Sequence, residues 1–408
     1  MKQITNPKFI LVFTIIVASL GYFVDLYDIL LFTVVRKASL LSLGVSEIDS
    51  LNIGLDLLNW QVIGLVLGGI FWGVLGDKKG RLSVLFGSIL IYSIANIANG
   101  FIQSIDAYRA LRFLAGLGLA GELGAGITIV SETMSAQNRG YGTMVITMVG
   151  MLGAVAASFI GIHFEWRTAY IIGGVMGLCL LLLRISVFES SLFKKMKNEN
   201  ISRGNILLLI KNKKIFLKYI RCILIGLPTY FIVGLLLTAV PEFGKVFGLS
   251  ESPSSAIAVI VTYTSISLAE ILCATISQRF KSRRVALGIF LTITLIGIFL
   301  FLIIPPKTIN SFYFRFVIMG IGIGFWVTMI TNATEQFGTN LRATVTTSVP
   351  NIIRGLLYPV NLVFLMLKPS LGLVTTCVII GFPCMILALV SVYYSEETFG
   401  VNLDYTEN

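Results

Sequence analysis

The sequence is dominated by apolar stretches long enough to cross a lipid bilayer. About twelve such stretches, each of roughly 20 residues, follow one another along the chain. A bilayer offers backbone groups no hydrogen-bond partner, so segments of this kind fold as helices. The pattern predicts an all-α membrane protein with twelve transmembrane helices. The expected spans are 8–34, 53–76, 82–103, 107–131, 140–162, 166–188, 216–240, 254–278, 285–304, 311–334, 343–367 and 371–394.

The composition supports a chain that lives mostly in lipid. Hydrophobic residues make up 56% of it and charged residues only 12%, whereas soluble domains carry about 25% charged residues. The net charge of +11 comes from short loops between apolar runs rather than from one face. We therefore expect no nucleic-acid partner. The first apolar run carries Asp25 and Asp28 and lacks a cleavage site, so we interpret it as a membrane helix and not as a signal peptide.

An internal repeat divides the chain in two. The segment Arg112 to Arg139 reads RFLAGLGLAGELGAGITIVSETMSAQNR, and its skeleton returns, offset by 203 residues, from Arg315 to Arg342. Two copies of one unit are the signature of a transporter built from two parallel halves. We expect six-helix halves at 1–189 and 216–408, the second ending in a short tail. Residues 190–215 then form a cytoplasmic linker with an amphipathic helix.

Charged residues gather in the loops, and their signs differ between the two sides of the expected membrane. One set of loops is strongly basic, and the other mixes acidic and basic residues. The basic set comprises Lys78, Lys79, Arg81, Arg139, residues 194–218, residues 279–284 and Arg342. The positive-inside rule assigns the basic side, and both termini with it, to the cytoplasm. We therefore expect a multi-pass protein of the plasma (inner) membrane.

Several carboxylates fall at membrane depth, where an unpaired charge costs several kcal/mol. They are Asp25, Asp28, Glu122 and Glu270. Arg112 and Arg354 are their expected partners. A carboxylate that alternates between an arginine and a protonated state couples proton movement to a change of access, so we predict that these four carry protons. The alternative is a static buried ion pair that fixes helix register.

The loop between the second and third spans has a recognisable pattern. It reads GVLGDKKGR from Gly73 to Arg81, with glycines that let helix ends meet and Asp77 placed to sit on a neighbouring helix N-terminus. This pattern resembles the signature loop of the major facilitator superfamily. The resemblance implies the major facilitator fold, with transport by alternating access, and we expect a monomer. The second copy of the loop is degraded to RFKSRR, where Phe280 replaces the aspartate.

Two further pairs lie at the expected cytoplasmic ends of the fourth and tenth spans. They are Glu132 with Arg139 and Glu335 with Arg342. Similar Glu…Arg pairs in the family link helix ends in the outward-open state and break when the cytoplasmic side opens. The resemblance therefore implies a gating role. The full expected gating set is Gly73, Asp77, Gly80, Arg81, Glu132, Arg139, Glu335 and Arg342.

Shorter strings resemble particular branches of the family. VDLYD in the first span is similar to the DAYD of proton–phosphate symporters, and GLGLAGE resembles the fourth helix of sugar and metabolite symporters. The seventh span, PTYFIVGLLLTA, has no acidic residue to match the phosphate symporters. This departure argues against phosphate as the substrate.

Arg354 is the sharpest single prediction of a substrate contact. It follows Arg342 by twelve residues, which places it ~18 Å deep at ~1.5 Å per residue. Organic anion transporters of the family have an arginine here that faces the central cavity. The resemblance implies that Arg354 binds an anionic group, bidentately if that group is a carboxylate or phosphate. The alternative is a pair with Glu270 in the empty protein. Asn351 and Tyr358 share its helix face.

Other polar and aromatic residues at membrane depth complete the expected site, and each has helix–helix contact as its alternative role. They are Arg112, Tyr22, Gln61, Thr128, Tyr230, Trp326, Asn332 and Asn361. Asp56 and Asn59 are expected near the outer entrance. His163, the single histidine, is expected at the membrane interface and not in a metal site.

These features favour a proton-coupled transporter that imports a small organic anion. One alternative is a carrier of a neutral or zwitterionic solute, such as a sugar, a polyol or an amino acid, in which the arginines are only counter-ions. Another is a receptor of the same fold that signals without transporting. The sequence has no nucleophile–base pair, nucleotide loop or metal-ligand set, so we expect neither an enzyme nor a cofactor or metal.

Overall fold

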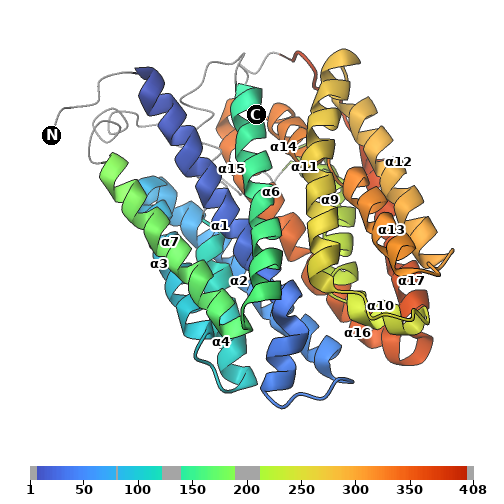
Figure 1. The fold of residues 1–408 in the computed structure, drawn as a ribbon. Coiled ribbons are helices and arrows are strands. Elements are labelled where there is room, and N and C mark those ends of the chain that lie inside the picture. The colour runs from blue at the N-terminus through green and yellow to red at the C-terminus, as the bar shows by residue number, and fades with distance from the viewer. Residues whose placement is uncertain (1–6, 80, 122–138, 189–211, 402–408) are drawn as a thin grey trace.

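A computed structural model describes residues 7–79, 81–121, 139–188 and 212–401 of the chain. The described part is a bundle of helices, most of which have roughly aligned axes (Figure 1). It contains no strand. The first group of helices is α1 Pro7–Ser42, α2 Ser50–Lys79, α3 Arg81–Asn99, α4 Ile105–Leu119, α6 Arg139–His163 and α7 Trp166–Phe188. The second group is α9 Lys213–Tyr230, η2 Phe231–Leu236, α10 Val240–Val246, α11 Ser255–Arg279, α12 Arg283–Leu302, α13 Ile309–Gly322, α14 Trp326–Glu335, α15 Thr339–Gly355, α16 Leu357–Leu371 and α17 Leu373–Tyr393.

Within the described ranges, ten helical segments are long and apolar enough to cross a membrane. The shorter apolar part of α3, Phe86–Asn99, adds one crossing. Helix α4 lies in the fourth expected crossing, whose remaining residues from 122 onward are outside the described part. The structure thus confirms the predicted all-α membrane fold with twelve crossings.

The sequence repeat is also visible in how the helices pack. Helix α4 lies against α2 and α3, and α13 lies against α11 and α12 in the same arrangement. Helix α1 contacts α6 and α7, as α9 contacts α15 and α17. Glycines allow the close approach: a side chain at Gly116 would collide with the backbone of Gln61 in α2, and one at Gly320 with Thr262 in α11.

The two groups of helices meet along two seams. Helix α2 packs against α15 and α16, and α6 packs against α11. The predicted linker, residues 190–215, falls almost entirely outside the described residues, as does its expected amphipathic helix. We call the end where α7 ends and α9 begins the linker end. The opposite end, where α1 ends and α2 begins, we call the distal end.

Three crossings expected to be continuous helices are broken. The seventh changes from α-helix to π-helix after Tyr230, just beyond Pro228, a residue that cannot donate a backbone hydrogen bond. The tenth is interrupted between α13 and α14 in the glycine-rich run that ends at Gly324. The eleventh is interrupted at Leu356, directly after Arg354 and Gly355. Helix breaks at membrane depth occur where backbone lines a cavity or binding site.

The segment after α17, expected to be a short tail, contacts the rest of the protein through Glu397, Thr398 and Phe399. The Ser282 hydroxyl, which caps α12 by accepting from the backbone N–H of Val285, donates to the Glu397 carboxylate. Glu397 also accepts from the backbone N–H of Arg283 at 2.8 Å. Partial burial alone would raise the pKa of Glu397. These hydrogen bonds outweigh it and hold that pKa below its usual value near 4.5.

We predict that Ser282→Ala lowers the free energy of unfolding by about 1 kcal/mol, because it removes a helix cap. Glu397→Gln should lower it at about pH 7 and make no difference under strongly acidic conditions. The contribution of Glu397 exists above its unfolded pKa and disappears as pH falls through its lower folded pKa. Thermal unfolding in detergent across this pH range measures both effects. A constant gap between Glu397→Gln and the parent protein at every pH would contradict the docking.

Candidate functional site

A buried ion pair joins the two halves at the centre of the bundle. Arg354, near the end of α15, donates from Nη2 to Oδ2 of Asp25 in α1 at 3.3 Å. Both side chains are almost completely inaccessible to solvent. Arg354 also donates from Nε to the Tyr230 hydroxyl at 3.0 Å. From the sequence, Glu270 was the alternative partner expected for Arg354. In the structure Arg354 pairs with Asp25 instead.

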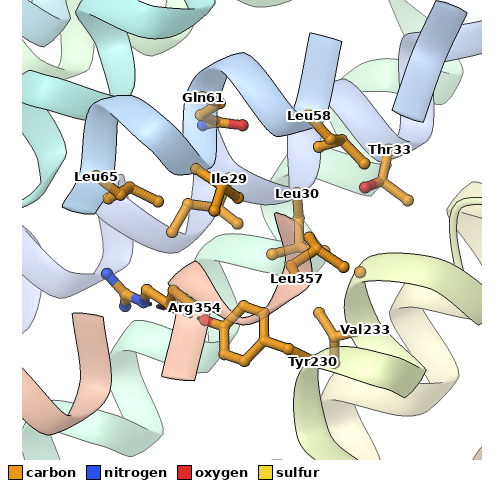
Figure 2. A pocket seen from close by; sticks show the side chains of 12 residues that line it. Ile29, Leu30, Thr33, Leu58, Gln61, Leu65, Tyr230, Val233, Arg354 and Leu357 are labelled. Atoms are coloured by element: carbon orange, nitrogen blue, oxygen red, sulfur yellow. Dashed lines mark hydrogen bonds between the residues drawn. The ribbon is translucent and has the colours of Figure 1, made fainter. Parts of the chain in front are cut away.

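A small cavity adjoins this ion pair between the two halves (Figure 2). Its walls are Ile29, Leu30, Thr33, Leu58, Gln61, Val62, Leu65, Tyr230, Val233, Gly234, Arg354 and Leu357. Its volume is about 30 Å³, room for about one or two water molecules. Binding pockets for organic molecules are roughly 300–1,000 Å³. The cavity is therefore constricted in this conformation and has to widen before it holds a solute.

The helix breaks explain why these residues reach the cavity. Tyr230 is the last residue of α9, and Val233 and Gly234 belong to the π-helix that follows it. Arg354 and Leu357 flank the interruption between α15 and α16. A π-helix shifts the register of its side chains, and such shifts are frequent at functional sites. Sequence periodicity, which assumes an unbroken helix, does not show this placement.

A second charged cluster lies within the N-terminal half, around Arg112 in α4. Its Nη2 donates to Oε1 of Gln61, and its Nη1 lies 3.9 Å from Oδ1 of Asp28. The guanidinium also sits over the Phe32 ring, 5.0 Å from its centre, and donates to the Tyr170 hydroxyl at 3.5 Å. Arg112 is not among the residues that line the cavity, whereas Gln61 is. The arginine thus reaches the cavity only through Gln61.

The remaining predicted proton carriers differ in their surroundings. Glu270 in α11 is buried where α11 packs on α6, with the Thr147 side chain and the Val327 backbone next to its carboxylate. No lysine or arginine in the described part of the chain forms an ion pair with it. Glu122 lies outside the described residues, as does Thr128.

Two of the predicted aromatic residues lie close to the ion pair without lining the cavity. Tyr22 in α1 is buried and interacts electrostatically with Arg354 and Tyr230. Trp326, at the start of α14, has its ring centre 6.0 Å from that of Tyr230. Both therefore belong to the surroundings of the Arg354–Asp25 pair.

Three other predicted site residues lie further away. Asn351 donates to the backbone oxygen of Ala120 at 3.3 Å and so joins α15 to the N-terminal half. Asn332 accepts from the Thr398 hydroxyl at 3.1 Å, toward the linker end. Tyr358 is 37% exposed and is not among the residues that line the cavity. Its sharing a helix face with Arg354 stays a prediction, because Leu356 between them keeps helical backbone angles.

Most of the predicted gating residues are not described in side-chain detail. Gly73, Asp77, Arg81, Arg139 and Arg342 lie within α2, α3, α6 and α15. Gly80 and Glu132 lie outside the described residues. Glu335 is described, and its carboxylate contacts Arg283 at 3.1 Å and the Thr398 hydroxyl at 2.8 Å. The expected pair of Glu335 with Arg342 stays a prediction.

The distal end holds contacts between the halves that the sequence did not indicate. Arg36 lies beyond the first expected span, 8–34, but α1 continues to Ser42, and Arg36 is buried with 1% exposure. Its Nη2 donates to both carboxylate oxygens of Glu242 in α10, at 2.8 and 2.9 Å. Nearby, Lys245 donates to Glu47 at 2.9 Å. The opposite charges in these pairs are 206 and 198 residues apart, so no local sequence pattern would have revealed them.

Amide contacts continue this closure toward the cavity. Asn361 donates to Asn59 at 2.8 Å, with both side chains buried, and Lys368 donates to Asn52 at 3.0 Å. Asp56, expected at the entrance with Asn59, instead pairs with Arg109 within the N-terminal half at 2.6 Å. His163 is exposed and contacts the backbone oxygen of Phe159. We refer to Arg36–Glu242, Glu47–Lys245, Asn59–Asn361 and Asn52–Lys368 as the distal contacts.

The Glu47 carboxylate, one of the distal contacts, keeps its charge over the physiological pH range. Hydrogen bonds from Lys37 and then from Lys245 lower the pKa of the Glu47 carboxyl to about 2. The group is therefore ionised in all but strongly acidic solution. The bridge between Glu47 and Lys245 thus does not respond to pH changes in the physiological range through Glu47.

We predict that Arg36→Glu opens the distal end and that Arg36→Glu with Glu242→Arg closes it again. The probe is Thr33→Cys, at the cavity wall, in a background without the five native cysteines. A loss of about 1.4 kcal/mol of contact energy should speed modification by an impermeant thiol reagent about tenfold. Arg109→Ala, which breaks an ion pair within one half at the same end, is the matched control. Equal acceleration by the control would contradict a specific closure.

Comparisons with known proteins agree with this architecture. A family model described as the Major Facilitator Superfamily matches residues 9–360. The niacin transporter NiaP of Acinetobacter baylyi is 36% identical over 132 residues, which cover 31% of this chain and 30% of the relative. The 4-hydroxybenzoate transporter PcaK of Pseudomonas putida is 29% identical over 161 residues, 38% of this chain and 36% of the relative.

The likeness to a solved structure extends over almost the whole chain. The crystal structure of a D-xylose-proton symporter matches with a TM-score of 0.72 at 16% identity, covering 96% of this chain and 100% of that one. At this identity the match shows the fold. The alignments with the two curated relatives span only about a third of their length. The family model, by contrast, covers most of the sequence and both helix groups. The protein is a multi-pass membrane protein that belongs to the major facilitator superfamily.

Proposed function

We propose that the protein is a secondary active transporter that couples proton entry to uptake of a small organic anion by alternating access. The observation that carries this proposal is the buried ion pair between Arg354 and Asp25, next to a cavity between the halves. A cation at this depth is costly unless an anion faces it. Arg354 therefore pairs with the Asp25 carboxylate when the carrier is empty and with a substrate anion when the carrier is loaded.

Proton coupling follows from the competition for Arg354. An incoming anion replaces Asp25 only if the carboxylate left behind is neutralised, because an unpaired buried charge costs about 3–5 kcal/mol. A proton on Asp25 supplies that neutralisation. Asp28, 3.9 Å from Arg112, is a further position where a proton can reside, as is buried Glu270, which forms no ion pair within the described residues. The alternative is that the buried ion pairs of Asp25 and Asp28 are static and only fix the helix register.

The closed distal end suggests how access alternates. The positive-inside pattern assigns the linker end to the cytoplasm and the distal end to the outside of the plasma (inner) membrane. The distal contacts then close the outer path, with the constricted cavity beneath them. Separation of the halves at this end exposes Arg354 to external substrate. The predicted gating residues, among them Asp77 and Glu335, would act at the other end.

The names of the relatives are consistent with an anionic substrate. Niacin and 4-hydroxybenzoate, which name two of them, are both carboxylates at neutral pH. A carrier of a neutral or zwitterionic solute, or of phosphate, is the alternative. In the neutral-solute case Arg354 is only the counter-ion of Asp25.

We predict that Arg354→Ala lowers uptake of organic anions by proteoliposomes about 30-fold or more, because loss of a buried charged partner costs about 2 kcal/mol or more. Arg354→Lys should fall in between, since it keeps the charge and loses the planar fork. Arg221→Ala, an arginine on the same half that contacts Tyr394, is the control. Unimpaired anion uptake by Arg354→Ala would contradict the proposal. Surviving uptake of a sugar or amino acid would identify a neutral-solute carrier.

A further inference from the structure

Two buried hydrogen-bond donors at the cavity have no partner. Gln61 and Arg354 both line it (Figure 2) and are 2% and 1% exposed. Within the described part of the protein, Nε2 of Gln61 and Nη1 of Arg354 make no hydrogen bond. A buried donor without an acceptor costs about 1–3 kcal/mol. Two such donors at one cavity indicate where an acceptor group of a ligand binds.

Arg112 determines which atom of the Gln61 amide remains available. A guanidinium only donates hydrogen bonds, so the Gln61 atom that contacts it has to be the oxygen. This leaves the NH₂ group of Gln61 as the unpaired end. Arg112 is itself held by Tyr170, by the Phe32 ring and by the nearby Asp28. Arg112, which does not line the cavity, thus fixes the orientation of the Gln61 amide.

The rest of the cavity wall is almost entirely apolar. Its apolar members are Ile29, Leu30, Leu58, Val62, Leu65, Val233, Gly234 and Leu357. Apart from the two donors, only the Thr33 and Tyr230 hydroxyls are polar, and the latter already accepts from Arg354. A sugar would bury several hydroxyls without partners against such a wall. A second negative charge would have no cation to meet, because Arg354 is the one charged residue among the lining side chains.

We propose that the substrate is a monocarboxylate with an apolar body, its carboxylate held between Gln61 Nε2 and Arg354 Nη1. Arg112 is a positioning residue that orients Gln61. This inference rests on the proposed transport of an organic anion and names the class of anion.

The arrangement discriminates a carboxylate from the corresponding carboxamide. A carboxylate has two acceptor oxygens for the two donors, whereas an amide turns an NH₂ group toward one of them. Sites built to hydrogen-bond one partner reject analogues that leave buried polar groups unpaired. Gln61→Glu replaces the donor with an acceptor and adds a negative charge beside the site. It should therefore disfavour carboxylates and favour amides.

The test measures binding to the purified full-length protein by thermal stabilisation and calorimetry. The probes are benzoate, cyclohexanecarboxylate and hexanoate, each beside its own amide, with phthalate, phosphate and xylose for comparison. We expect the monocarboxylates to bind at least about tenfold more tightly than their amides and than phthalate. Gln61→Leu should reduce this ratio about tenfold, and Gln61→Glu should invert it. Gln336→Leu, which removes a buried glutamine that donates to Ser395, should leave the ratio unchanged.

Arg112→Lys tests the positioning role. A lysine keeps the positive charge near Asp28 but loses the fork that holds Gln61, so the carboxylate-to-amide ratio should fall while Arg354 still binds anions. A variant that loses all anion binding, or one that keeps the full ratio, would overturn the assignment of Arg112.

The outcomes separate this inference from the function on which it rests. Equal binding of acids and amides, or binding of phthalate or phosphate without any monocarboxylate, overturns the inference and leaves anion transport standing. Stabilisation by xylose alone overturns both. Stabilisation by none of the monocarboxylates likewise overturns the assigned substrate class.

Discussion

The structure depends on one interaction, the ion pair between Asp25 and Arg354. Two charges are held out of water at the centre of the bundle, and each comes from a different half of the protein. Either charge left alone would be strongly destabilising, so the pair keeps the halves together for as long as nothing replaces one partner. In the mechanism that we propose, a proton and an anion together replace the internal partners. The interaction that joins the halves is then also the one that substrate and proton break.

The residues around this pair form three groups that differ in chemistry and position. The distal contacts are charged or amide pairs that join the two halves at one end. The cavity wall is apolar, with its donors gathered around Arg354 and Gln61. The second cluster, around Arg112, reaches the cavity through the Gln61 amide. Asp28 is thus connected to the cavity wall through Arg112 and Gln61.

The fold could be predicted from the sequence because it is encoded by local patterns that recur along the chain. The length of the apolar stretches fixes the crossings, and the offset of 203 residues between Arg112 and Arg315 fixes the two-fold arrangement. The depth of Arg354 also followed from simple helix geometry. The partner of Arg354 did not, because Asp25 and Glu270 are both buried carboxylates and only the packing of α1 against the C-terminal half selects between them.

The contacts that the sequence did not reveal depend on where helices end and on what they meet. Arg36 lies beyond the first expected span, 8–34, because a charge near the end of an apolar run is normally solvated. In the structure α1 continues past it, and its partner Glu242 lies in the other half. The special role of Gln61 depends on which of its atoms Arg112 contacts, and no sequence pattern encodes that choice.

The most direct test of the central claim is the number of protons taken up when a substrate anion binds. It can be measured as the pH change of a weakly buffered solution of the purified protein. If the anion displaces Asp25 from Arg354, the protein takes up close to one proton per anion bound, and Asp25→Asn binds the anion with no proton uptake. Binding of the anion without proton uptake by the unmodified protein would contradict the account.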